Sequence, residues 1–202
     1  MKKLIGLFLL VLGLNATISA QSYTNLVGQK TPPLIIEKWI SPVPEFANKF
    51  VIVDFWATWC GPCRMSMPHM NALAAKFAKE IIIIGLSKET EATVRGFKGM
   101  EYYSAIDTKG RLQSAVGVRA IPNVMIINPS GIVCWQGHPA SLTDQILDEL
   151  LQNYNKSQKE NTTGSTPQIV VRLDDSIDYQ IDNKQGPETE EDRRARDTFE
   201  NE

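Results

Sequence analysis

The chain has 202 residues, of which 43% are hydrophobic, and it carries a formal net charge of −2. This length and this hydrophobic content suffice for one ordinary core, so a single globular domain is expected. A nearly neutral charge, without a stripe of lysine and arginine interleaved with aromatic residues, argues against nucleic acid as a partner.

The first twenty residues have the pattern of an export signal. Two lysines precede an apolar stretch from Leu4 to Leu14, and the segment ends in the small residues Ser19 and Ala20. A membrane anchor is the alternative, but this apolar stretch is much shorter than the roughly 20 residues that a spanning helix requires. We therefore expect residues 1–20 to be a signal peptide, and the mature protein to be soluble outside the cytoplasm.

A strand–helix–strand unit is predicted next. The β-branched and aromatic run Val51–Trp56 is typical of a buried strand, and Ile81–Ser87 is a second run of this kind. Between them, residues 62–79 place apolar side chains at helical spacing. Parallel pairing of the two strands is the natural outcome of this order.

The following segments predict a second half that ends in a hairpin and a helix. The expected elements are a short helix within Glu89–Lys98, a strand at Tyr102–Ile106, a brief helix at Lys109–Val116, a hairpin over residues 123–137 that turns at residues 128–131, and a final helix from Ser141 with Asp144 at the capping-box position. Together these elements give one domain over residues 26–153.

Residues 154–202 are rich in polar and acidic residues, a composition typical of a linker or a disordered tail. The segment Val170–Asn183 departs from it, because apolar and polar residues alternate there as in a hairpin. An isolated hairpin is marginal in water, so this one must dock or stay disordered. We expect disorder over 186–202 and a tail that contributes little to stability.

Two cysteines, Cys60 and Cys63, stand between the first predicted strand and the helix that follows it. A structural disulfide fits poorly, because so short a loop hardly constrains the unfolded chain. A copper or zinc site that uses both thiolates and a histidine is the alternative, although structural zinc usually takes four ligands and no second cysteine pair is present.

A redox pair agrees best with this position. At a helix N-terminus, unpaired N–H groups and the positive end of the helix dipole favour a thiolate. We therefore expect Cys60 to be an exposed attacking thiol and Cys63 to resolve the mixed disulfide. The third cysteine, Cys134, lies in an apolar strand and is expected to be a small buried hydrophobic residue.

The sequence VDFWATWCGPC, residues 53–63, resembles the active-site strand and helix of thioredoxin. The surrounding chain is similar to the exported thiol:disulfide oxidoreductases of the TlpA/ResA type. This resemblance implies an α/β, thioredoxin-like fold with a central mixed sheet flanked by helices. The wide spacing between Cys60 and Pro122 is similar to that produced by the TlpA/ResA-type insertion, here around residues 89–106.

The resemblance also implies roles for particular residues. Asp54, six positions before Cys60, would exchange a proton with Cys63 and would have a raised pKa, unless it is simply a satisfied core residue. Pro122 would be a cis-proline against the disulfide, unless it is an ordinary turn proline. Many ResA-like proteins carry an acidic residue where this chain has Ser66. The substrate-binding residues would be Trp59, Gly61, Pro62, Ile121 and Pro122.

The predicted function is that of an extracytoplasmic reductase of protein disulfides in the periplasm or cell envelope of a bacterium, with no cofactor and no resident metal. By resemblance, its substrates would be oxidised envelope proteins such as apocytochrome c, which would place it in cytochrome c biogenesis. Its electron donor would be a membrane thiol transporter of the DsbD or CcdA kind. Thiol-based copper or zinc handling remains the alternative.

Overall fold

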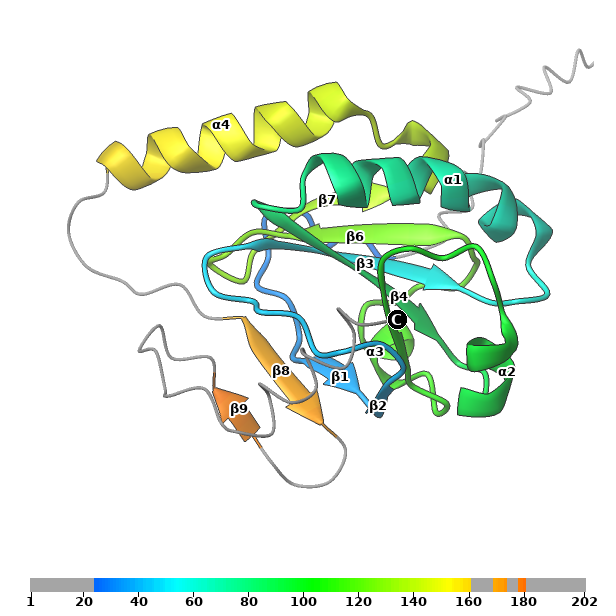
Figure 1. Ribbon diagram of the computed structural model, residues 1–202. Helices are drawn as coiled ribbons and strands as arrows, with labels where there is room; N and C mark the ends of the chain where they lie inside the picture. Colours follow the sequence, from blue (N-terminus) through cyan, green and yellow to red (C-terminus); the bar gives the residue numbers. More distant parts are fainter. Residues whose placement is uncertain (1–23, 161–168, 174–177, 181–202) are drawn as a thin grey trace, which may run out of the picture.

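A six-stranded mixed sheet in the order β2-β5-β4-β3-β6-β7 lies at the centre of the computed structural model, which describes residues 24–160, 169–173 and 178–180 (Figure 1). The elements are β1 (Leu34–Ile36), β2 (Lys38–Trp39), β3 (Phe50–Trp56), α1 (Gly61–Lys76), β4 (Ile81–Ser87), α2 (Glu91–Gly96), β5 (Tyr103–Ile106), α3 (Arg111–Ala115), β6 (Asn123–Ile127), β7 (Val133–Gly137), the 3₁₀ turn η1 (Pro139–Ser141), α4 (Asp144–Glu160), β8 (Val170–Leu173) and β9 (Asp178–Gln180). The expected signal peptide (1–20) and the expected disorder of 186–202 lie outside the described residues. No helix in the described ranges is long and apolar enough to cross a membrane.

The central strands β3 and β4 pair in parallel, and every residue of both is buried. Burial on both faces explains why their sequences are nearly continuous apolar runs rather than alternating ones. On the other side of β3, β6 pairs with it antiparallel, and β7 pairs antiparallel with β6. The predicted α/β class with a mixed sheet and flanking helices is confirmed.

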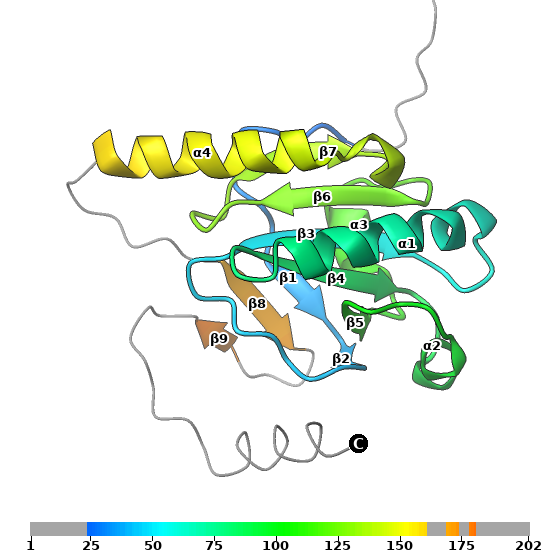
Figure 2. The same ribbon diagram turned by 45° about the horizontal axis from the view of Figure 1, so that its top comes forward.

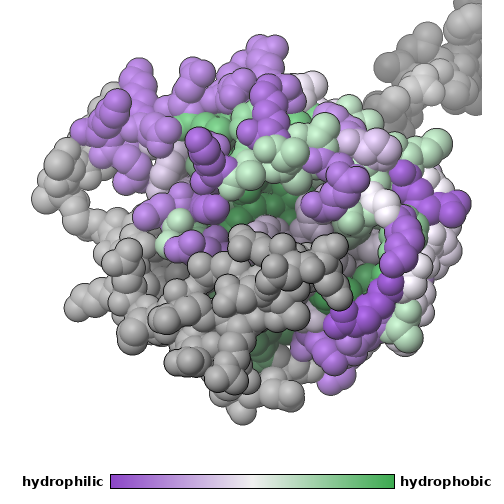
Figure 3. Space-filling view, viewed as in Figure 1, coloured by the Kyte–Doolittle hydropathy of each residue, from purple (hydrophilic) through white to green (hydrophobic). Residues whose placement is uncertain are grey.

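Each face of this sheet has its own core. Phe50 and Ile52 pack on one face with residues of α1 and α4, whereas Val51 and Val53 pack on the other face with residues of α3 and β1. Helices α1 and α4 lie side by side over the first face (Figure 2). The outer side of α4 is covered by hydrophilic residues, as an amphipathic surface helix requires (Figure 3).

The last helix begins later than the sequence predicts. Ser141 belongs to the turn η1, and α4 starts at Asp144 with the amide of Ile146 donating to Thr143 Oγ1 at 3.3 Å. The reason is that Leu142, between turn and helix, is fully buried. Thr143 therefore takes the capping position that had been assigned to Ser141.

The structure differs from the expected polar tail in two respects. Helix α4 continues to Glu160 rather than ending near Asn153, and the ring of Tyr154 packs edge-on against Phe50 at 5.3 Å between centroids. Strands β8 and β9 form an antiparallel hairpin, and β8 pairs in parallel with β1 to make a second, three-stranded sheet. Ile169 and Val171 are each 5% exposed and join the core beneath the main sheet. The alternation over Val170–Asn183 thus corresponds to a docked hairpin.

Candidate active site

Cys60 is the N-cap residue of α1, directly after the end of β3. Its backbone is extended, with φ −76° and ψ 101°, and its sulfur accepts a hydrogen bond from the amide of Cys63 at 3.2 Å. Pro62 in the first turn has no N–H group to leave unpaired, which suits this position. One backbone donor of the helix start, the amide of Cys63, therefore points at the sulfur of Cys60.

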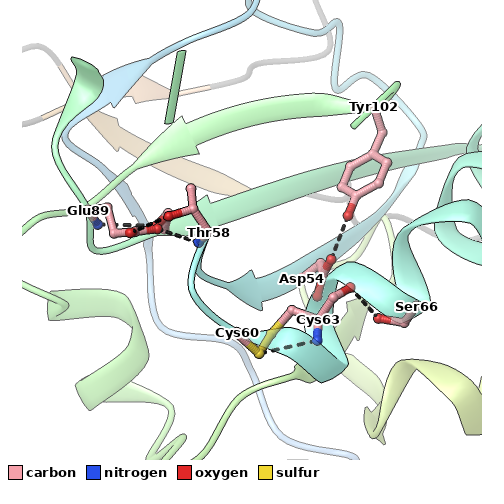
Figure 4. The surroundings of a disulfide bond; sticks show 8 residues. Asp54, Thr58, Cys60, Cys63, Ser66, Glu89 and Tyr102 are labelled. Carbon is pink, nitrogen blue, oxygen red and sulfur yellow. Dashed lines mark hydrogen bonds between the residues drawn. A yellow bond between two sulfur atoms is a disulfide. The ribbon is translucent and has the colours of Figure 1, made fainter. Parts of the chain in front are cut away.

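Cys60 and Cys63 form a disulfide, with 2.00 Å between the sulfurs and 5.2 Å between the Cα atoms (Figure 4). Both residues are buried, at 3% and 2% exposure, and belong to a cluster with Trp56 and Met67. The expectation that Cys60 is exposed is thus wrong for the oxidised protein, because these side chains pack around the disulfide.

The accessible surface at this site comes from the neighbours of the cysteines. Trp59 is 72% exposed and Met65 is 78% exposed. Gly61, Pro62, Arg64 and Met65 line a shallow depression on the same surface. These residues, rather than the buried cysteines, therefore form the accessible surface beside the disulfide.

The Ile121–Pro122 peptide bond is cis. It lies just before β6, whose Asn123 pairs with Phe55 of β3, and Ile121 packs against the cluster that contains the disulfide. The sheet therefore brings the loop with the cis-proline beside the cysteine pair, although some sixty residues separate them in sequence.

Asp54 occupies the centre of the sheet, 3% exposed, opposite Gly85 of β4 and Val124 of β6. The Tyr102 hydroxyl donates a hydrogen bond to Oδ2 at 2.7 Å, while Oδ1 has no hydrogen-bond partner. Burial raises the pKa of this carboxyl from 3.8 to about 6, and the hydrogen bond from Tyr102 opposes that rise only in part. In Figure 4 the carboxyl lies between the Tyr102 hydroxyl and Cys63.

Sequence reasoning missed Tyr102 and Glu89 as neighbours of the site. The Glu89 carboxylate accepts hydrogen bonds from the amide of Thr58 at 2.6 Å and from its hydroxyl at 2.7 Å, which ties the loop before Cys60 to the end of β4 (Figure 4). Ser66, which replaces the acidic residue of many ResA-like proteins, donates to the carbonyl of Cys63 at 2.9 Å. No local sequence pattern marks Glu89 or Tyr102, since both act on residues far away in the chain.

Cys134 and the two histidines make contacts away from the disulfide. His69 Nε2 lies 2.6 Å from the carbonyl of Leu142, and His138 Nδ1 accepts from the amide of Ala140. Burial raises the pKa of Cys134 to about 12. In the part of the chain that the structure describes, no three histidine, cysteine or acidic residues are grouped so that they could hold a metal ion. Nothing in this arrangement supports the copper or zinc alternative.

Comparisons with known proteins agree with this geometry. The thioredoxin-like family model matches residues 48–133. Thiol-disulfide oxidoreductase ResA of Bacillus thuringiensis subsp. konkukian is 31% identical over 134 residues, which are 62% of this chain and 77% of the relative. ResA of Geobacillus thermodenitrificans is 30% identical over 140 residues, which are 63% of this chain and 80% of that protein.

A solved structure extends the comparison to the fold. The solution structure of a candidate protein disulfide isomerase from Bacteroides thetaiotaomicron superimposes with a TM-score of 0.55 at 21% identity, and covers 70% of this chain and 95% of that one. The fold is thioredoxin-like, with a disulfide at the start of its first helix. By its sequence, the chain belongs to the ResA/TlpA-type family of thiol-disulfide oxidoreductases.

Proposed function

We propose that this protein is an extracytoplasmic reductase of protein disulfides, in which Cys60 attacks the substrate and Cys63 resolves the mixed disulfide. The observation that carries the proposal is the Cys60–Cys63 disulfide at the N-terminus of α1, with the buried carboxyl of Asp54 behind it. Such a pair is redox-active when backbone donors stabilise one thiolate and a base can deprotonate the other thiol.

The first step uses the reduced protein. The Cys60 thiolate attacks one sulfur of a substrate disulfide, so a Cys60–substrate bond forms and the substrate disulfide breaks. The other substrate sulfur leaves as a thiolate and takes a proton from water. The amide of Cys63, which lies 3.2 Å from the Cys60 sulfur in the oxidised protein, stabilises the attacking thiolate.

The second step releases the substrate. The Cys63 thiol gives its proton to the Asp54 carboxylate and attacks the sulfur of Cys60. The Cys60–Cys63 bond forms, the Cys60–substrate bond breaks, and the second substrate sulfur leaves with its electron pair. The substrate has then gained two electrons, and the cysteine pair of the protein is oxidised.

We propose that the substrate contacts the exposed residues beside the buried disulfide. Trp59 and the depression beside Gly61 and Pro62 would receive the polypeptide around the substrate disulfide. The backbone of Ile121, next to cis-Pro122, would pair with an extended substrate segment, as the resemblance implies.

The proposed setting is the bacterial cell envelope. The signal-like pattern of residues 1–20 supports export, with a thioredoxin-like domain from residue 26 and a C-terminal extension. Oxidised envelope proteins are the proposed substrates, including those of cytochrome c biogenesis. A membrane dithiol donor of the DsbD or CcdA kind would re-reduce the Cys60–Cys63 disulfide after each turnover.

The reductase direction requires a reducing potential. Gly61-Pro62 is the dipeptide between the cysteines of thioredoxin, whose potential is about −270 mV. We expect equilibration with glutathione to give a value in this range. A potential near the roughly −120 mV of a strong oxidant such as DsbA would reverse the direction of the proposed activity.

The roles of the cysteines are tested by trapping. In Cys63→Ser no thiol remains to expel the substrate, so covalent mixed disulfides on Cys60 should accumulate and should dissolve with dithiothreitol. Both Cys60→Ser and Cys63→Ser should abolish insulin reduction, whereas Cys134→Ser, the matched control, should retain it. Failure to trap a model disulfide peptide, together with tight binding of Cu(I) by Cys60 and Cys63, would favour metal handling instead.

A further inference from the structure

Tyr102 reaches the buried carboxyl of Asp54 from the far side of β4. We propose that Tyr102 is a positioning residue for the thiol exchange, which holds Asp54 for proton transfer with Cys63 and sets the pH range in which the mixed disulfide is resolved. The inference rests on the proposed function and deepens it by naming a residue that acts through Asp54.

The hydrogen bond between the two side chains is short and shielded from water. Tyr102 Oη lies 2.7 Å from Asp54 Oδ2, and the two residues are 8% and 3% exposed. Burial and the nearby carboxyl raise the pKa of Tyr102 far above its ordinary value, so the hydroxyl stays protonated and keeps the hydrogen that it donates to Oδ2. With Oδ2 occupied by this donor, Oδ1, which has no hydrogen-bond partner, is the oxygen that can take the Cys63 proton.

Helix α1 is hydrogen-bonded to the loop between α2 and β5, residues 97–102, which carries Tyr102. The Asn71 side chain donates to the carbonyl of Gly99 at 2.9 Å and accepts from the amide of Glu101 at 3.0 Å. Since α1 also carries Cys63, the thiol and the tyrosine that orients its base are attached to one rigid element.

A glycine in β4 makes room for this loop. A Cβ atom added to Gly85 would lie 2.7 Å from Met100 Cε and 3.0 Å from Trp56 Nε1. Since Gly85 is the strand partner of Asp54, Met100 and Trp56 close the space next to the carboxyl. The loop that carries Tyr102 therefore also contributes to the exclusion of water from Asp54.

Among the residues that the structure describes, few titratable groups face Asp54. They are Tyr102 from the segment before β5 and the cysteine pair from α1, whereas the neighbouring strands contribute Gly85 and Val124. The tyrosine hydroxyl favours the charged form of the carboxyl, against the effect of burial. Without this donor, the pKa of Asp54 should rise further above about 6, and the base would form only at higher pH.

The test is the pH dependence of the resolving step in Tyr102→Phe. The reduced full chain is mixed with Ellman's reagent, and the release of the second thionitrobenzoate, which Cys63 expels from Cys60, is followed by stopped flow. We expect the midpoint of this step to move upward by about one pH unit, while the first attack by Cys60 changes less than about twofold. Tyr103→Phe, the matched control at a neighbouring tyrosine that is 37% exposed, should keep the wild-type midpoint.

A second variant leaves the tyrosine in place. Asn71→Ala removes both hydrogen bonds to the loop and should shift the midpoint in the same direction by a smaller amount. If Tyr102→Phe fails to fold, this variant decides the question. A wild-type midpoint in a folded Tyr102→Phe protein, or in Asn71→Ala where that variant decides, would overturn the inference.

The Asp54→Asn background separates this inference from the proposed function. In that background Tyr102→Phe should produce no further shift, and an equal shift would show that Tyr102 acts on the thiols directly. If Asp54→Asn alone leaves the rate of release and its pH dependence unchanged, the role proposed for Asp54 fails. If Asp54→Asn abolishes the pH dependence while Tyr102→Phe keeps the wild-type midpoint, the inference alone fails.

Discussion

Asp54 is a carboxyl group in an otherwise apolar strand, 3% exposed and with one oxygen unpaired. Burial makes this group a better proton acceptor near neutral pH, because its pKa approaches the working pH. The same burial destabilises the folded state whenever the group is charged. Burial of Asp54 therefore favours its proposed role as a proton acceptor but lowers the stability of the folded protein when the carboxyl is charged.

The raised pKa of Asp54 predicts that the stability of the folded protein depends on pH. An acid whose pKa is 3.8 unfolded and about 6 folded binds its proton more tightly in the folded state. The oxidised protein should therefore lose stability as the pH rises through this window, by roughly 3 kcal/mol from this group. Asp54→Asn lacks this loss, so its free energy of unfolding in urea should rise relative to that of the wild type as the pH rises from about 4 to about 6, and the difference should then stay constant. Identical pH dependence in both proteins would contradict the raised pKa.

At the scale of elements, the loop between β3 and α1 depends on an acidic side chain beyond β4. Glu89 binds both the amide and the hydroxyl of Thr58, two residues before Cys60. The hydroxyl of Ser87 also donates to Glu89, at 3.3 Å. This arrangement fixes the loop on which the N-terminus of α1, and thus the cysteine pair, is mounted.

Removal of this carboxylate should loosen the loop. Glu89→Ala leaves the amide of Thr58 without its partner, and we expect a loss of about 1 to 2 kcal/mol in stability together with a several-fold slower first attack by Cys60. Thr58→Val, the matched variant, removes only the hydroxyl and should cost less on both counts. Denaturation curves and alkylation rates of Cys60 check the prediction. Equal losses in the two variants would show that the bond to the amide contributes nothing.

At the scale of the whole molecule, the C-terminal hairpin belongs to the domain. Strand β8 pairs with β1, and Ile169 and Val171 are buried in the core beneath the main sheet. We therefore expect this hairpin to contribute to stability, in contrast to the prediction from sequence, because a strand that fills part of the core cannot be removed without exposing it.

Truncation provides the corresponding test. A chain that ends after Glu160 loses both buried side chains, and full burial of an aliphatic side chain contributes about 1.5 to 3 kcal/mol. We expect it to be less stable by roughly 3 to 6 kcal/mol in urea denaturation, with a lower melting temperature. A chain that ends after Gln180 retains the hairpin and serves as the control. Equal melting of the two truncated proteins would contradict a structural role for β8.

Features that depend on local spacing could be predicted from the amino-acid sequence. The order of the main elements from β3 to α4, the place of Cys60 and Cys63 at a strand-to-helix turn, and the buried position of Asp54 all follow from patterns only a few residues long, whereas the short strands β1 and β2 were not predicted. Helical and strand periodicity, together with the turn residues, act over such short distances, so they can be recognised in one sequence.

Contacts between groups that are distant in the chain became visible only in the folded structure. Tyr102 and Asp54 are 48 positions apart, and Thr58 and Glu89 are 31 positions apart. The docking of β8 on β1 and the burial of Cys60 likewise depend on packing between remote segments. Local patterns do not encode these contacts, because they depend on the order and register of the strands, and a shift of one residue turns every side chain to the opposite face.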